Sequence, residues 1–133
     1  MDYVKIGGRA YDVIVTELSE NFNILYSENT GRTMSRGARM TLDPLGTFYG
    51  HKVTFQRKKG KESEYDQLFD YVSYPRYDGI YVEIAHNQSI IKYDAYISSG
   101  ERALKRVDKG TGKVYWDKFY LNIIPMEAQV LPE

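Results

Sequence analysis

The sequence predicts an α+β fold, a mostly antiparallel β-sheet or sandwich of six to eight strands with one helix packed on it. Three observations support this prediction. Apolar and polar residues alternate in most segments of the chain, which is the pattern of half-buried strands. One segment has the spacing of an amphipathic helix. The strand-like segments follow one another through short turns, which favours antiparallel pairing.

The first half of the chain is expected to be mainly strand. Alternation indicates strands over residues 3–6, 10–18, 21–26 and 47–57. Residues 27–39 contain three arginines, two glycines and few apolar side chains. We therefore expect a long loop or an extended hairpin tip there. Asp43-Pro44-Leu45-Gly46 is typical of a turn.

One helix is expected just after the middle of the chain. Its apolar stripe has the spacing i, i+3, i+4 and i+7 and is formed by Tyr65, Leu68, Phe69 and Val72. Ser63 is placed to cap the helix, and Pro75 lies just past its end. A helix of about three turns would cover one face of the sheet.

The second half of the chain returns to strands. Alternation predicts them over residues 79–85, 89–98, 103–107 and 114–124, with turns at Asn87-Gln88 and at residues 109–113. No repeat or low-complexity segment interrupts the pattern. We expect residues 1–133 to form a single domain.

Composition and charge narrow the range of functions. Lys and Arg total 18, as do Asp and Glu, whereas a dedicated nucleic-acid-binding protein normally has a basic excess. The absence of Cys excludes disulfides and thiolate metal sites and fits a reducing compartment. We expect no signal peptide at residues 1–5, and no apolar run is long enough to span a membrane. We therefore expect no nucleic-acid and no membrane partner. The 13 tyrosines suit half-buried strand positions and protein interfaces.

Residues that could carry chemistry are few and scattered. His51 and His86 are expected to be solvated, one where a strand begins and one at a turn. Carboxylates around the helix start suit the positive end of the helix dipole. Glu83 and Asp94 are expected to pair with Lys92 or with arginines across the sheet. We therefore expect no catalytic residue, no cofactor and no metal site, and no enzymatic activity.

The arginines of residues 27–39 have two interpretations. As solvated loop charges they need no partner. As interface residues they would dock on a neighbouring subunit, because Arg is favoured in interfaces and so polar a loop gains little by folding alone.

Six motifs spread over nearly the whole chain carry a resemblance to a known group of proteins. They are Ile6-Gly7-Gly8-x-x-Tyr11, Gly31-Arg32-Thr33-Met34, Asp43-Pro44-Leu45-Gly46-Thr47-Phe48-Tyr49, Glu64-Tyr65-Asp66-Gln67-Leu68-Phe69, Tyr115-Trp116-Asp117-Lys118-Phe119 and Ile124-Pro125-Met126. With these motifs the chain resembles small structural proteins encoded in the tail region of siphophages and prophages of Gram-positive bacteria.

The resemblance implies a virion component of the tail-tube, distal-tail or baseplate-hub type, made in the host cytoplasm. Such proteins form hexameric or trimeric rings and contact other tail proteins through sheet edges and a long protruding loop. Residues 28–40 are placed as that loop. The subunit interface is then expected to include Arg32, Met34, Arg36, Arg39, Met40 and Tyr49.

Two other classes of function stay open from the residues themselves. A small binding module would present tyrosines and Trp116 as an aromatic platform for a sugar or a peptide. An enzyme would have to assemble its site from scattered residues, including His51 and His86.

Overall fold

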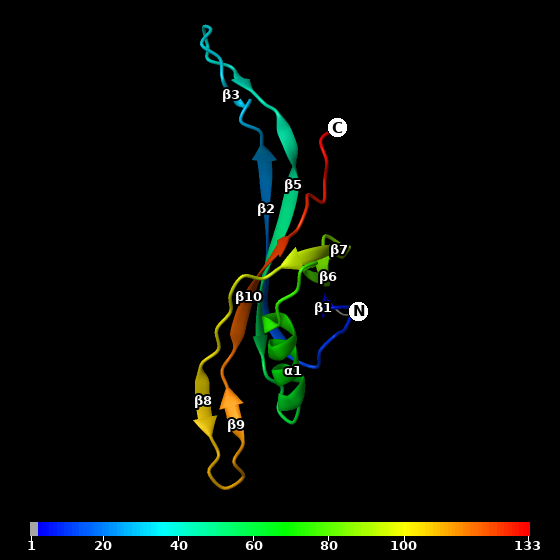
Figure 1. The fold of residues 1–133 in the computed structure, drawn as a ribbon, viewed down its shortest axis with the longest axis vertical. Coiled ribbons are helices and arrows are strands. Elements are labelled where there is room, and N and C mark those ends of the chain that lie inside the picture. Colours follow the sequence, from blue (N-terminus) through cyan, green and yellow to red (C-terminus); the bar gives the residue numbers. More distant parts are fainter. Residues whose placement is uncertain (1–2) are drawn as a thin grey trace.

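Residues 3–133, described by a computed structural model, form antiparallel strands and one α-helix (Figure 1). Six strands make a curled sheet in the order β1-β6-β7-β10-β5-β2, and two short hairpins, β3–β4 and β8–β9, extend from it. This confirms the predicted α+β class and its antiparallel sheet. The elements are β1 (Val4–Ile6), β2 (Ile14–Tyr26), β3 (Gly31–Arg32), β4 (Met40–Thr41), β5 (Pro44–Gln56), α1 (Glu62–Ser73), β6 (Ile80–His86), β7 (Ser89–Tyr96), β8 (Leu104–Val107), β9 (Val114–Trp116) and β10 (Phe119–Pro125).

The curled sheet consists of two halves that meet along a short line of contact. β2, β5 and β10 form one half, in which β2 pairs with β5 along its whole length. β1, β6 and β7 form the other half. β10 joins the halves, and it pairs with β7 only at Ile124↔Tyr96 and Pro125↔Ala95. We call this two-pair contact the seam.

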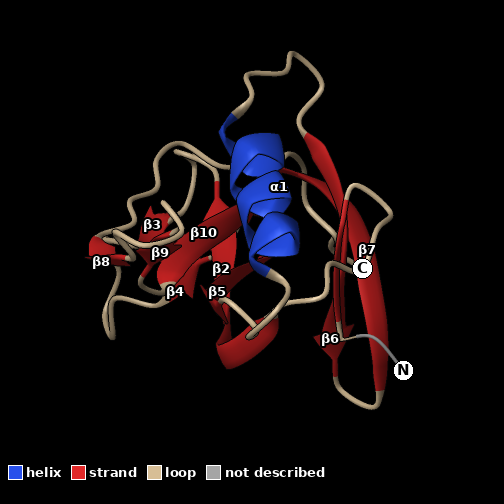
Figure 2. Ribbon diagram, turned by 90° about the horizontal axis from the view of Figure 1, so that it is seen from below, coloured by secondary structure: helices blue, strands red, loops and turns tan. Residues whose placement is uncertain are grey.

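The hydrophobic core lies where α1 fills the space between the two halves (Figure 2). Tyr65, Leu68 and Val72 of the helix are buried, as the sequence pattern predicts. The ring of Phe119 lies 5.2–5.4 Å from the rings of three other aromatic residues, Phe55, Tyr65 and Phe69. The remaining buried apolar residues are Ile6, Val53, Ile80, Val82, Ile84, Tyr93, Ala95, Leu121 and Ile123.

The β2–β5 hairpin extends beyond the rest of the sheet as a projecting arm (Figure 1). The β10–β5 ladder ends at Ile123↔His51, so the arm consists of residues 21–50, with β3 and β4 at its tip. The C-terminal segment lies along the β5 side of the arm, where the Thr47 amide donates to the Val130 carbonyl at 2.9 Å. The Gln129 side chain accepts from the Tyr49 amide at 3.0 Å and donates to the Tyr49 carbonyl at 3.1 Å. The outer edge of β2 pairs with no other strand in the described part of the chain.

Two strand boundaries in the first half differ from the prediction. β2 is one continuous strand, where two strands, residues 10–18 and 21–26, were expected, because β5 supplies it with partners along its whole length. A register shift between Val15 and Glu17 is the one interruption near its start. β5 begins at Pro44, inside the expected turn at residues 43–46. A proline is tolerated there because the first residue of a strand need not donate to the ladder.

Two boundaries in the second half also differ. The expected strand over residues 114–124 is divided into β9 and β10, with Asp117 and Lys118 between them. The Asp117 carboxylate accepts from the Lys118 amide at 2.8 Å. The helix begins at Glu62, and Lys61 holds the cap position without a capping side-chain hydrogen bond, so Ser63 is not the cap.

Replacing Gly79 tests how closely β6 is held to β7. Gly79 has a φ of +77°, and a Cβ on it would lie 2.4 Å from the Ala95 carbonyl oxygen. Gly60 has a φ of +80° with no heavy atom within 4 Å of such a Cβ. Both alanine substitutions incur backbone strain of about 1–3 kcal/mol. Gly79→Ala must also displace backbone, so we expect the larger fall in the free energy of unfolding, measured by urea denaturation. Equal losses in Gly79→Ala and Gly60→Ala would contradict this close contact.

Candidate functional site

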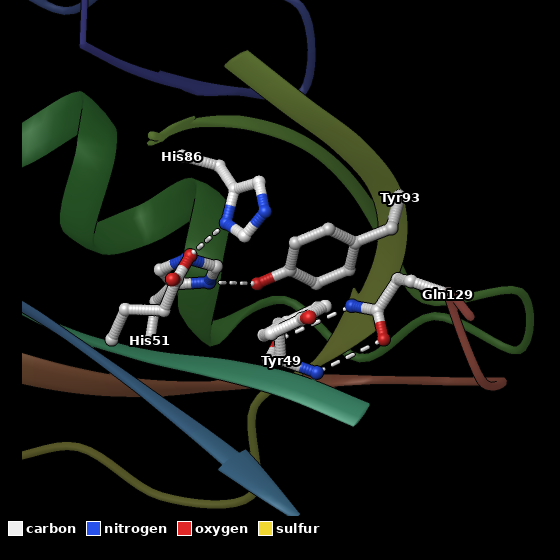
Figure 3. Close-up of polar contacts among 6 residues, drawn as sticks. Tyr49, His51, His86, Tyr93 and Gln129 are labelled. Atoms are coloured by element: carbon white, nitrogen blue, oxygen red, sulfur yellow. Dashed lines mark hydrogen bonds and ion pairs between the residues drawn. The ribbon is translucent and has the colours of Figure 1, made fainter. Parts of the chain in front are cut away.

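A partly buried polar cluster spans the junction of the two halves of the sheet (Figure 3). The side chain of His51 on β5 is 0% exposed. Its Nδ1 lies 2.7 Å from the hydroxyl of Tyr93 on β7, and its Nε2 lies 2.7 Å from Oε2 of Glu20 on β2. His86, the last residue of β6, places Nδ1 2.7 Å from the same Glu20 oxygen. We call these four residues the histidine cluster.

The protonation states in the histidine cluster follow from burial and from the shared carboxylate. Burial lowers the pKa of His51, although Glu20 acts in the opposite direction. Burial alone would raise the pKa of Glu20, but the hydrogen bonds from His86 and His51 outweigh it and leave that pKa lowered. Burial raises the pKa of the Tyr93 hydroxyl. The state at neutral pH is therefore a neutral His51 beside an ionised Glu20 and a neutral Tyr93.

This state fixes the direction of each hydrogen bond. An ionised carboxylate only accepts, so His51 Nε2–H and His86 Nδ1–H both donate to Glu20. The neutral His51 ring then has an unprotonated Nδ1, which accepts from the Tyr93 hydroxyl. All polar atoms of the His51 side chain are thus satisfied within the histidine cluster.

The prediction that both histidines are solvated is wrong for His51. It lies within β5 rather than where a strand begins, and its side chain points into the core. The signal was present in the sequence, because His51 has the same strand phase as the buried Val53 and Phe55. His86 does lie at the end of a strand, but it is also held by Glu20, and its ring centre lies 4.8 Å from that of Tyr49 with the two planes tilted by 54°.

Five other carboxylates, those of Asp12, Glu62, Glu64, Asp66 and Glu83, are engaged in ion pairs. Glu83 lies 3.6 Å from Lys92, which confirms the predicted cross-strand pair. In the helix, Glu64 pairs with Arg9, and Asp66 accepts from Arg102 at 3.1 Å. Among residues 3–133, no group of three His, Asp or Glu side chains has an arrangement that could hold a metal ion. The single helix of this range is too short and too polar to cross a membrane.

Five of the six predicted interface residues lie together at the tip of the arm. Arg32 and Met40 lie in the β3–β4 hairpin, and Met34, Arg36 and Arg39 lie in the turn that joins its strands. All five are exposed, and Met34 is 102% exposed. Tyr49, the sixth, lies apart from them near the base of the arm, half-buried beside His86.

The outer edge of β2 is a second candidate surface, which sequence reasoning did not locate. Residues 21–26 carry no charged side chain, and Phe22 on this stretch is 69% exposed. Ile24, Leu25 and Tyr26 are also exposed. Natural proteins usually protect a long edge strand with charges, prolines or a covering segment. This part of the edge has none of these among the described residues, so it is suited to pairing with another chain.

Comparisons with known proteins show a likeness of fold. No family model matches the sequence, and no curated protein matches it. The structure is similar to a chain of a solved structure described as the tail of an empty GTA particle with C6 symmetry. The two share 11% sequence identity, the match covers 90% of this chain and 82% of that chain, and the TM-score is 0.54. At this identity the likeness concerns the fold.

Removing the Tyr93 hydroxyl tests whether His51 depends on the histidine cluster. In Tyr93→Phe the buried Nδ1 of His51 loses its partner, which costs about 1–3 kcal/mol of unfolding free energy. The matched control is Tyr96→Phe on the same strand, whose exposed side chain makes no described hydrogen bond. Urea denaturation at pH 7.5 should show a loss for Tyr93→Phe alone. A loss of similar size in both variants would show that the hydrogen bond is not its cause.

Stability is expected to fall as the pH drops below the ordinary His pKa of 6.5. The pKa of His51 is lowered in the folded chain, so on acidification the unfolded chain takes up the proton first. The free energy of unfolding therefore decreases from about pH 6.5 down to the pKa of His51 in the folded chain. The lowered pKa of Glu20 acts in a separate window, below its ordinary value of 4.5. Unfolding free energies at pH 7.5, 6.5 and 5.5 should therefore decline less steeply in His51→Gln than in the natural chain. Equal slopes would rule His51 out as the cause.

Proposed function

We propose that this protein is a non-catalytic structural protein of a phage tail, which assembles with copies of itself into rings. The observation that carries the proposal is the likeness of its fold, over 90% of the chain, to a chain from the C6-symmetric tail of a GTA particle. The resemblance of the sequence to tail-region proteins of siphophages and prophages of Gram-positive bacteria points to the same role. The protein would be made in the host cytoplasm and would reside in the virion.

The outer edge of β2 is the surface that we assign to contacts within a ring. Among residues 3–133, no strand pairs with the outer backbone groups of this 13-residue strand, which also carries exposed apolar side chains such as Phe22 and Leu25. Backbone hydrogen bonds to an added strand provide affinity, and the alternating side chains provide specificity. Pairing with another copy would also protect this edge from uncontrolled association.

The tip of the arm is the surface that we assign to contacts with the next ring or with other tail proteins. The β3–β4 hairpin is the segment farthest from α1 (Figure 1), and Arg32, Arg36 and Arg39 lie in it and in its turn, with exposed side chains. A guanidinium group forms two parallel hydrogen bonds with a carboxylate and is well suited to interfaces. The fully exposed Met34 adds an adaptable apolar group between these charges.

The aromatic-platform alternative receives less support from the side chains. Trp116 is half-buried, and the Arg102 guanidinium lies 4.3 Å from the centre of its ring. The same guanidinium lies 4.0 Å from the ring centre of Phe69 and donates to Asp66. Trp116 therefore serves to hold the β8–β9 region against α1, and one face of its ring is already occupied.

The enzyme alternative would depend on the two histidines. His51 is enclosed, and its ring nitrogens are both used within the histidine cluster. We therefore assign His51 a positioning role in the fold and propose no reaction.

An assembly assay tests the proposal. The purified natural chain is expected to form rings of six copies, seen by negative-stain electron microscopy and by light scattering after gel filtration. Phe22→Lys places a charge on the β2 edge and should leave a folded monomer. A loss of about 1.4 kcal/mol in the free energy of association would reduce the amount of ring at least tenfold at equal protein concentration. Replacing Arg32, Arg36 and Arg39 together by Ala should leave the rings but prevent their stacking.

Tyr77→Lys is the matched control, because Tyr77 is an exposed aromatic residue outside the arm. It should assemble as the natural chain does, and circular dichroism should show that all variants keep their strands. A natural chain that stays monomeric at millimolar concentration, or a Phe22→Lys variant that still forms rings, would refute the assigned edge.

A further inference from the structure

The histidine cluster lies beside the seam, where few backbone hydrogen bonds connect the two halves of the sheet. The seam has two residue pairs, and one of them contains Pro125, which has no amide hydrogen to donate. The Met126 amide adds one hydrogen bond to the Asp94 carbonyl at 2.9 Å. Side-chain contacts, both the packing of α1 between the halves and the histidine cluster, must therefore contribute much of the restraint on the angle between the halves.

The histidine cluster supplies such contacts from both sides of the seam. Glu20 and His51 come from the β2–β5 half, where they are direct cross-strand partners. His86 and Tyr93 come from the β6–β7 half. Two hydrogen bonds of 2.7 Å cross between the halves, His86 to Glu20 and Tyr93 to His51 (Figure 3).

Both crossing bonds depend on the protonation of the groups that make them. In its present direction, with the Tyr93 hydroxyl donating, the bond between Tyr93 and His51 requires an unprotonated Nδ1 on His51, because a protonated His51 would present a second N–H to that hydroxyl. The hydroxyl would then have to turn and accept, and the enclosed ring would carry a charge away from water. The His86 bond is strongest while Glu20 is ionised.

Few other charged groups surround the histidine cluster. The charges that act on His51 are those of Glu20 and His86. β10 places the apolar Ile123 opposite His51, and the tilted ring of Tyr49 on β5 contacts that of His86. The hollow beside His86 is lined by three further charged residues, Lys92, Asp94 and Glu127. Of these three, Lys92 is paired with Glu83, whose carboxylate lies 3.6 Å from its ammonium nitrogen.

We propose that the histidine cluster is a pH-sensitive contact that fixes the angle between the two halves of the sheet at neutral pH and releases it in mild acid. A released state exposes His51 to water, where it binds a proton readily. In the closed state, in which the histidine cluster is intact, His51 is enclosed and binds a proton less readily. The two states therefore differ in proton affinity, and acid shifts the population toward the open one. This inference concerns the isolated chain and does not depend on the proposed role in a phage tail.

The absence of Cys makes a direct distance measurement possible. Ser19 on β2 and Gln88 in the β6–β7 turn are both exposed and lie on opposite sides of the seam. A Ser19→Cys, Gln88→Cys double variant carries one spin label at each position. Pulsed electron paramagnetic resonance then reports the distance distribution of the monomer at pH 7.5, 6.5 and 5.5.

We expect one narrow distribution at pH 7.5 and a second, separate distance in acid. The ratio of open to closed molecules should rise by up to about tenfold for each pH unit below 6.5. On the same labelled background, His51→Gln should remove the response, because Gln keeps a donor and an acceptor but does not titrate in this range. Glu20→Gln should increase the open population throughout, because neutral hydrogen bonds replace charge-assisted ones.

Two results would overturn the proposal. One is a natural-chain distribution that stays unchanged between pH 7.5 and 5.5 while circular dichroism shows a folded protein. The other is a response of His51→Gln equal to that of the natural chain. Since labelled monomers are measured below the concentration at which rings form, either result leaves the assembly proposal untouched, and a failure to form rings leaves this measurement valid.

Discussion

The apolar face of a six-stranded sheet has to be covered by one helix of 12 residues, and this constraint determines the shape of the protein. Six strands at a spacing of about 4.8 Å span about 24 Å, whereas a helix is only about 10 Å across. A flat sheet would leave much of that face in water. Curling brings β5 and β10 on one side and β6 and β7 on the other against Tyr65, Leu68 and Val72 of α1 (Figure 2). The seam and the projecting arm both follow, since the seam is where the sheet bends and the arm lies beyond the cover of the helix.

The elements that could be predicted from the sequence are those whose own residues meet the core. α1 and β6 lie where they were predicted. Burial of every second side chain in the strand, and of every third or fourth in the helix, leaves a periodic pattern in the sequence. The boundaries of β2 could not be found in this way. Most of its side chains are exposed on both faces, so the alternation over residues 10–18 and 21–26 does not reflect burial and does not mark where β2 begins and ends. β2 is a strand because it pairs with β5 along its length, and this pairing cannot be predicted from the residues of β2 alone.

The histidine cluster shows the same division between local and distant information. A strand phase shared with Val53 and Phe55 indicates that His51 points inward, and a buried imidazole must have partners. The identity of those partners is not local. Glu20 is 31 residues away and Tyr93 is 42 residues away, and they come from strands on opposite sides of His51. The curl of the sheet brings them together. The sequence can therefore predict which face of the sheet a polar residue points to. Its hydrogen-bond partners can be predicted only when the register of the whole sheet is known.

The two sides of the arm differ, and this difference bears on the kind of assembly that the chain could form. The β5 side is occupied by the C-terminal segment, through Gln129 and Val130, while the β2 side has no partner in the described chain. Two β2 edges paired about a two-fold axis would close after two copies, because such a contact uses the same patch on both. A ring of six copies requires a contact between two different patches, repeated head to tail. The opposite edge of the sheet, β1, has only three residues and cannot match a strand of 13. A ring would therefore require the β2 edge of one copy to meet a surface of its neighbour other than β2, and the exposed apolar side chains of residues 21–26 would have to be covered by that surface.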